Sequence, residues 1–178
     1  TLADTARSLA GDTEVTIALG DGLIGLQGGG RRTTVRLLDV EFVKYRSLLP
    51  TEHTTTVEVP VAELSEAIKR VALVTDRGHH LRMQVSDGTL GLAAGGDDEG
   101  SAEEELAVSA DGAELLIAFN PGYLLDGLSV LRTDAVRLAF TTPARPALLL
   151  PVSDDGDSKN GSAEPAYRYL VMPARLPG

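Results

Sequence analysis

The sequence predicts an α+β protein built from a repeated unit of one helix and several short antiparallel strands. Helical patterns begin near Thr1, Val61 and Pro121, so the unit recurs about every 60 residues. The segments GDGLIGL and SDGTLGL, each around an Asp-Gly turn, show the clearest sequence similarity between units. Such a unit is too small to bury its own sheet, so neighbouring units are expected to pack together.

The first unit is expected to run from a helix into three strands. Leu2, Ala6 and Leu9 share one helical face, and Gly11 follows as a stop signal. Alternating apolar residues and turn signals then predict strands over residues 14–19, 23–27 and 31–39. Residues 40–53 read as a connection that carries apolar side chains.

The second unit begins with a β-branched strand over residues 54–59. Pro60 then stands at a permitted helix start, and Leu64, Ile68, Val71 and Ala72 form the apolar side of a helix over about residues 61–75. The period-2 pattern predicts strands over residues 81–85, 89–94 and 105–109.

The third unit repeats this order. A strand over residues 114–119 precedes Asn120, a suitable N-cap, and Pro121, which suits the first position of a helix reaching Arg132. Strands are expected over residues 135–141 and 147–152, with a polar loop over residues 153–165. The apolar tail from Tyr167 alternates like a strand until Pro173 removes a backbone donor, so we expect it to dock in a sheet.

Composition excludes several classes of protein. With 178 residues, 43% of them hydrophobic, the chain has enough apolar side chains for one or two small domains. It has no cysteine, which rules out disulfides and thiolate metal sites and fits a reducing compartment, so we expect a cytoplasmic protein. No apolar run approaches the roughly 20 residues of a membrane span. The net charge of −10 argues against a simple basic nucleic-acid binder, although basic residues can still gather on one face.

No enzyme site is expected. His53, His79 and His80 lie in connections without an HExxH pattern, and the acidic residues are too scattered to pair as acid and base. The glycines at 28–30 are followed by arginines instead of the Lys-Ser/Thr of a phosphate-binding loop. We therefore expect no catalytic residue, no metal and no cofactor. The alternative is an uncharacterised α+β enzyme. Catalytic turnover that a single carboxylate substitution abolishes would support this alternative.

Two motifs together resemble a known family. The helix motif FNPGYLLDGL at 119–128 and the ending YRYLVMPARL at 167–176 resemble the bacterial DNA polymerase III β sliding clamps, most closely the actinobacterial members. The run RLLDVEF at 36–42, the pair Leu49-Pro50 and the Glu-rich link before Leu106 also match. The resemblance implies a DNA-clamp fold and a non-catalytic processivity factor that encircles duplex DNA as a head-to-tail dimeric ring.

The resemblance also implies a domain organisation. Family members are about twice as long and have three similar domains of two units each, so this chain resembles their C-terminal half. Residues 1–50 would be the second half of the middle domain, and residues 51–178 the complete third domain. Because the family closes its ring through the first domain, we expect this chain by itself not to form the usual closed dimer.

The resemblance implies a groove that receives short peptide motifs of the polymerase, the clamp loader and repair proteins. Its residues would be Val43, Ser47, Leu48, Asn120, Tyr123, Ala144, Pro146, Leu170, Met172, Pro173, Ala174 and Arg175. Aliphatic and methionine walls suit a Leu or Phe anchor. From the residues alone, Leu170 and Met172 could equally be core residues of a strand. Whether the groove holds a peptide or a peptide-like inhibitor also stays open.

Two charged sets complete the expected sites. Basic residues on or after the helices would face the DNA backbone without reading bases: Arg7, Lys69, Arg70, Arg77 and Arg132. The subunit interface would use Ala72, Leu73, Asp97, Asp98, Glu103 and Glu104. Ordinary solvated charge is the alternative for both sets. The alternative for the whole chain is a stand-alone, clamp-derived peptide-binding module that does not encircle DNA.

Overall fold

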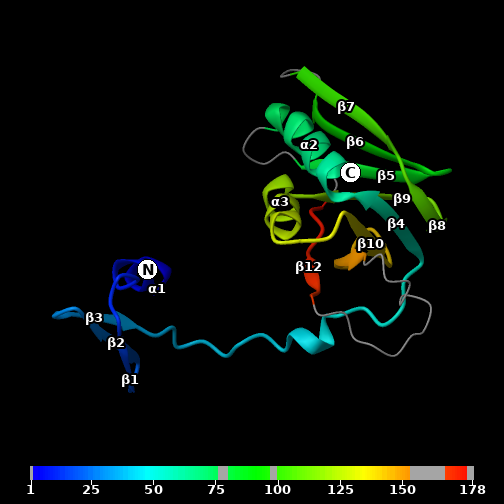
Figure 1. Ribbon diagram of the computed structural model, residues 1–178. Coiled ribbons are helices and arrows are strands. Elements are labelled where there is room, and N and C mark those ends of the chain that lie inside the picture. Colours follow the sequence, from blue (N-terminus) through cyan, green and yellow to red (C-terminus); the bar gives the residue numbers. More distant parts are fainter. Residues whose placement is uncertain (1, 76–79, 97–99, 153–166, 176–178) are drawn as a thin grey trace. The chain divides into compact units, whose positions relative to one another are not determined.

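The computed structural model describes residues 2–75, 80–96, 100–152 and 167–175 (Figure 1). The chain divides into two compact units, Thr1–Lys44 and Tyr45–Gly178, called unit 1 and unit 2 below. The assignment of residues 1–50 and 51–178 to two clamp domains stays a prediction. Among the described helices, none is long and apolar enough to span a membrane.

Unit 1 consists of one helix and a three-stranded antiparallel sheet. Helix α1 spans Leu2–Ser8, and the sheet has the order β1-β2-β3, formed by Thr16–Gly20, Leu23–Gly28 and Arg31–Arg36. Few side chains of this unit are buried, Leu9 and Leu26 among them, while Ile17 and Leu19 are largely exposed. The expectation that one such unit cannot bury its own sheet agrees with this exposure.

Unit 2 contains two helices and two antiparallel sheets. Its elements are η1 (Tyr45–Ser47), β4 (Thr55–Pro60), α2 (Val61–Val71), η2 (Ala72–Val74), β5 (Leu81–Ser86), β6 (Thr89–Gly96), β7 (Gly100–Ala107), β8 (Ser109–Gly112), β9 (Leu115–Phe119), α3 (Pro121–Ser129), β10 (Ala135–Phe140), β11 (Ala147–Val152) and β12 (Tyr169–Val171). The sheets have the orders β12-β11-β10-β4-β8 and β7-β6-β5-β9.

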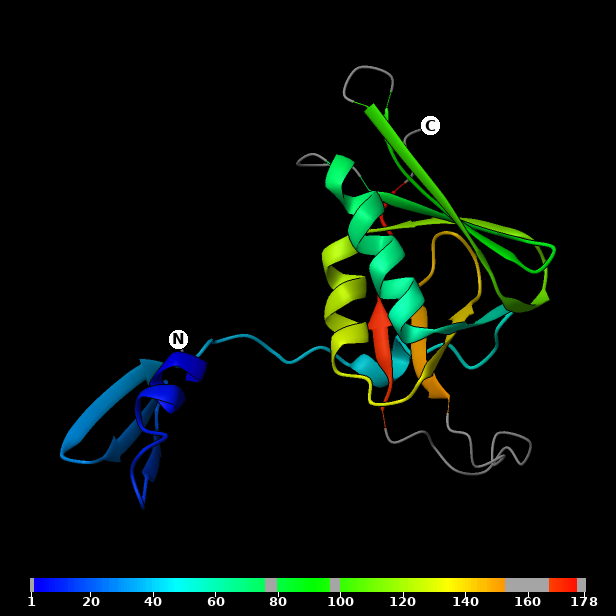
Figure 2. The same ribbon diagram turned by 45° about the horizontal axis from the view of Figure 1, so that its top comes forward.

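Both sheets combine strands from the second and third sequence units. β4 pairs with β10, and β5 pairs with β9, so neither predicted unit forms a sheet by itself. Helices α2 and α3 lie side by side in both views (Figures 1 and 2). Ile68 of α2 and Leu128 of α3 are buried in a core shared with the sheets, where Phe119 and Phe140 have ring centroids 6.5 Å apart. This interleaving joins the second and third sequence units in one compact unit.

The structure corrects several element boundaries, among them the end of β3, which is Arg36 instead of Asp39. Strand β7 begins at Gly100, five residues before the predicted 105–109 strand, and Ser109 already belongs to the separate strand β8. β7 pairs with β6 along its whole length. These backbone hydrogen bonds keep the glutamate-rich segment in a β-strand, although glutamate has a low preference for strands. Helix α2 ends at Val71 and continues only as the 3₁₀ turn η2, and α3 ends at Ser129. The predicted loop at 153–165 lies outside the described residues.

Candidate functional site

The apolar tail is the edge strand of the five-stranded sheet. β12 pairs antiparallel with β11, with Val171 opposite Ala147 and Tyr169 opposite Leu149. Val171 is buried. The prediction that the tail docks in a sheet is therefore confirmed. The strand ends before Pro173, whose ring nitrogen carries no hydrogen to donate to a neighbouring strand.

Beyond β12 the tail reaches the second sheet. Ala174 forms an isolated antiparallel bridge with Ala118 of β9, and its backbone nitrogen donates to the Ala118 carbonyl oxygen at 2.8 Å. β9 is the edge strand of the four-stranded sheet. A few residues of the tail thus connect the edges of both sheets.

These two pairings gather the predicted groove residues of unit 2. In the antiparallel bridge, the residues before Ala174 run beside those after Ala118, which brings Met172 toward Asn120. The pairing of Val171 with Ala147 similarly brings Met172 toward Pro146. Tyr123 lies within the first turn of α3, after Pro121 and Gly122, which follow Asn120. The site is therefore assembled from the start of α3, the start of β11 and the tail.

Met172 and Tyr123 are the most exposed large apolar side chains among the predicted groove residues of unit 2. Each is 58% exposed, whereas Val171, next to Met172, and Leu124, next to Tyr123, are buried. Leu170, on the same strand face as Met172, is half-buried. Met172 is therefore not a core residue, whereas Leu170 is partly packed. Exposed methionine and tyrosine side chains suit an apolar partner of variable shape.

Asn120 joins the local structure of α3 to this site. Its side-chain oxygen accepts a hydrogen bond from the backbone nitrogen of Gly122 at 2.8 Å, and Pro121 occupies the first helical position. The predicted N-cap is confirmed. The amino group of the same exposed side chain is a donor that can serve a bound peptide.

The other predicted groove residues lie as follows. Ser47 ends η1, and Leu48, which is 44% exposed, donates its backbone nitrogen to the Tyr45 carbonyl at 2.9 Å. Both views show η1 close to the start of β12 (Figures 1 and 2). Ala144 and Arg175 are exposed, in the β10–β11 turn and in the tail. Val43 belongs to unit 1, so its part in the groove stays a prediction.

Three predicted DNA-facing cations already have carboxylate partners in the chain. Arg7 pairs with Asp4 at 2.6 Å and Lys69 with Glu66 at 2.8 Å. Arg70 donates two hydrogen bonds to the Glu104 carboxylate, at 2.6 and 2.7 Å. Arg132 is exposed after α3, and among the described residues it has no carboxylate partner. Arg77 lies outside the described residues.

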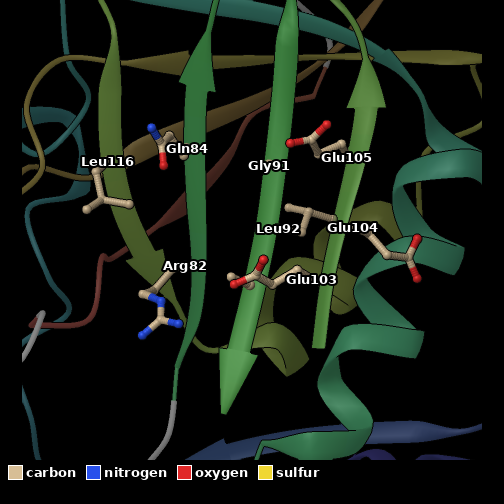
Figure 3. Close-up of a pocket in the computed structure, with 9 residues that line it drawn as sticks. Arg82, Gln84, Gly91, Leu92, Glu103, Glu104, Glu105 and Leu116 are labelled. Atoms are coloured by element: carbon tan, nitrogen blue, oxygen red, sulfur yellow. The ribbon is translucent and has the colours of Figure 1, made fainter. Parts of the chain in front are cut away.

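The predicted interface residues fall on η2 and β7. Leu73 is 85% exposed, while Ala72 is half-buried. β7 is an edge strand, and the hydrogen bond from Arg70 holds the pKa of Glu104 below its ordinary value. Figure 3 shows Glu104 pointing toward α2, whereas Glu103 points away from that helix. Asp97 and Asp98 lie outside the described residues.

The opposite face of this sheet carries a shallow hollow of about 290 Å³ (Figure 3). Its lining is mostly polar on β5 and β7 and apolar on β9: Arg82, Gln84, Gly91, Leu92, Ala93, Glu103, Glu104, Glu105 and Leu116. Within the part of the chain that the structure describes, no group of three or more His, Asp or Glu residues could hold a metal ion.

Sequence reasoning missed two residues that support the tail. Tyr169 of β12 packs against Gly127 of α3. A glycine in the middle of a helical pattern was the available signal, because glycine weakens a helix and its presence there often has a packing reason. Which side chain fills the space above that glycine could not be read from the sequence.

Comparisons with known proteins identify relatives of this chain. The family described as "DNA polymerase III beta subunit, C-terminal domain" matches residues 46–160. The chain is 43% identical over 183 residues to a β sliding clamp of Streptomyces coelicolor, covering 100% of this chain and 48% of that protein. It is 41% identical to the β sliding clamp homolog GriR of Streptomyces muensis, covering 99% and 47%. The chain spans about half the length of these curated relatives.

Solved structures show the same similarity. A DNA polymerase sliding clamp from Pseudomonas aeruginosa with ligand matches with a TM-score of 0.76 at 33% identity, over 98% of this chain and 46% of that chain. The sliding clamp of the same organism bound to griselimycin matches with a TM-score of 0.75 at 33% identity, over 98% and 45%. The expected clamp fold is confirmed.

Proposed function

The chain belongs to the family of DNA polymerase III β subunits, the β sliding clamps, and from this membership we propose that it serves as part of a processivity factor. In this proposal the whole protein is a head-to-tail dimeric ring that encircles duplex DNA in the cytoplasm. It performs no chemistry itself. It keeps the replicative polymerase on DNA because a closed ring leaves a duplex only at its ends or by opening.

The partner site in this proposal is the groove around the tail. The observation that carries it is that two separate strand pairings bring exposed Met172 toward Asn120 and Pro146, and that Asn120 caps the helix that carries exposed Tyr123. A Leu or Phe side chain of a partner peptide would cover the two exposed apolar residues, while Asn120 and Arg175 hold its polar groups. The polymerase, the clamp loader, repair proteins and a peptide-like inhibitor would compete for this groove.

Substitution of Met172 tests the groove. We expect Met172→Glu to weaken binding of a short Leu- and Phe-containing peptide by about ten-fold or more, since a buried, unpaired carboxylate costs at least about 1.4 kcal/mol. Val130→Glu is the matched control, because Val130 is also exposed, at 57%, but caps the end of α3 opposite to Asn120. Fluorescence anisotropy with a labelled peptide measures both. Equal affinity of Met172→Glu and the wild type would refute the groove.

DNA contact in the ring is proposed for the helices. Lys69 and Arg70 are held by Glu66 and Glu104, which leaves little net positive charge on α2 to grip phosphates. Weak contact with phosphates lets the ring slide along DNA, and encirclement of the duplex keeps the ring on it. The chain alone should therefore bind short duplex DNA weakly at about 0.15 M salt in a filter or anisotropy assay. Tight binding under these conditions would contradict this part of the proposal.

The interface between subunits is proposed for η2 and the free edge of β7. An exposed edge strand is a template for pairing with another chain, and Leu73 supplies an apolar contact beside it. In the complete protein, Leu73→Asp should shift the dimer–monomer equilibrium toward monomer in analytical ultracentrifugation. Val130→Asp is a control, because Val130 is 57% exposed at the end of α3, outside this edge. If both variants stay fully dimeric, the interface lies elsewhere.

A further inference from the structure

β12 lies along α3, and Gly127 allows the contact between them. Both views show the strand beside the helix (Figures 1 and 2). A Cβ atom placed on Gly127 would meet Cδ1, Cε1 and Cγ of the Tyr169 ring at 2.5, 2.7 and 3.0 Å. Real Cβ atoms essentially never approach other heavy atoms more closely than 3.0 Å. Any larger residue at position 127 would therefore displace the Tyr169 ring.

A second tyrosine rests on the same part of the helix. The rings of Tyr167 and Tyr169 are stacked, with centroids 6.4 Å apart and planes 14° apart. The Tyr167 hydroxyl donates to the Gly127 carbonyl oxygen at 3.4 Å, a long hydrogen bond. Both rings thus meet α3 at Gly127, just before the tail enters the groove.

Neither helix formation nor backbone conformation explains a glycine at this position. Alanine stabilises a helix interior better than glycine does. Gly127 is also not among the described glycines with positive φ, so an alanine could adopt its backbone conformation. The close approach of Tyr169 is the remaining explanation.

The position of Tyr169 matters because the strand that carries it is short and the tail beyond that strand has few ties. β12 has three residues, and beyond it Ala174 is tied to β9 by one backbone hydrogen bond. We propose that Gly127 is a positioning residue of the peptide groove. By letting Tyr169 lie against α3, it sets the place where Met172, Pro173 and Ala174 leave the sheet. This inference rests on the proposed peptide-binding function.

The test is a double-mutant cycle between positions 127 and 169 in the full chain. Gly127→Ala should raise the hydrogen-exchange rate of the Ala174 amide about ten-fold or more. It should also lower the affinity for a Leu- and Phe-containing peptide by a similar factor. In the Tyr169→Ala background, the same substitution should change neither quantity, because no ring remains to be displaced. Exchange at the Val136 amide, in the buried strand β10, should be unaffected and reports that the core is folded.

Two further variants control the cycle. Ser129→Ala places an alanine elsewhere on α3, on an exposed residue, and should leave the Ala174 exchange rate unchanged. Tyr169→Phe keeps the ring and should behave like the wild type in both measurements.

The outcomes separate this inference from the proposed function. If Gly127→Ala leaves the hydrogen-exchange rate of the Ala174 amide unchanged, the inference is overturned. It is also overturned if Gly127→Ala changes that rate equally in the wild type and in the Tyr169→Ala variant. A faster Ala174 exchange with unchanged peptide affinity also overturns it, because the groove would then not depend on this contact. Failure of the wild-type chain to bind the peptide counts against the proposed function, and the exchange rates still decide whether Gly127 positions the tail.

Discussion

At the scale of single residues, Asn120 combines a structural and a proposed functional role. Its side-chain oxygen caps α3 through Gly122, while the residue lies beside the tail at the groove. The two roles use different atoms of one carboxamide. Substitutions that keep the cap but change the amide can therefore separate them.

Asn120→Ala should lower the free energy of unfolding by about 1 kcal/mol, because it removes the acceptor for the Gly122 backbone nitrogen. Asn120→Asp keeps an acceptor oxygen and should stay close to the wild type in stability. Urea unfolding followed by circular dichroism measures the difference. Equal destabilisation by both substitutions would show that the cap contributes nothing.

The pair Arg70–Glu104 makes stability depend on pH. The hydrogen bond from Arg70 holds the pKa of Glu104 below its ordinary value of 4.5, so the folded state favours the ionised carboxylate. This contribution is fully present above the ordinary pKa and is lost as the pH falls through the lowered folded-state value. Because both groups are solvent-accessible, the effect should be small.

Glu104→Gln should therefore lower the urea midpoint relative to the wild type at about pH 7, and the gap should close at about pH 2. Glu103→Gln is the control, since Glu103 is exposed on the opposite strand face and has no ion pair within the described residues. A gap between wild type and Glu104→Gln that stays constant across this pH range would contradict the assignment.

At the scale of secondary-structure elements, the amphipathic pattern located α2 well. Of the residues predicted on its apolar side, Leu64, Ile68 and Val71 are buried, whereas Ala72 lies in η2 and is half-buried. β7 was located less well, because its alternating glutamates resemble a solvated loop. Its ends are set by pairing with β6, which no local pattern in β7 reveals.

Ile68 tests how much the apolar face of α2 contributes. Ile68 is fully buried, so Ile68→Ala should cost about 2–5 kcal/mol and Ile68→Val about 0.5–1.5 kcal/mol in unfolding free energy. Glu63→Ala, at an exposed position in the first turn of the same helix, should cost less than about 1 kcal/mol. Denaturant unfolding would contradict the packing of α2 if the alanine substitutions at 63 and 68 had equal effects.

At the scale of the whole molecule, the buried core belongs to unit 2. The main cluster of buried residues extends from Val57 to Val171 and includes no residue of unit 1. Unit 1 has a sheet whose first strand is exposed on both faces. The two units should therefore differ strongly in their ability to fold alone.

Residues 45–178, expressed separately, should unfold in one cooperative transition with a Tm close to that of the same unit in the full chain. Residues 1–44 should lack a cooperative transition, because a three-stranded sheet needs a covered apolar face for stability. Differential scanning calorimetry and near-UV circular dichroism distinguish these outcomes. A separate unit 2 without a transition would show that its core depends on unit 1.

The sequence by itself determined most of the helices and strands, their order and the motifs that indicate the clamp family. Apolar periodicity, Asp-Gly turns and the cap at Asn120 are local signals, and they act over a few neighbouring residues. The same locality explains why the tail was recognised as a strand with an abrupt end at Pro173.

Only the tertiary structure decided which distant residues meet. It exposed Met172 while burying Val171, paired Arg70 with Glu104 across 34 positions, and placed the Tyr169 ring over Gly127. These contacts depend on strand register and on how helices pack against sheets. A shift of one residue would turn every side chain of a strand to the opposite face, and the burial of both sheets against one core is what selects the register.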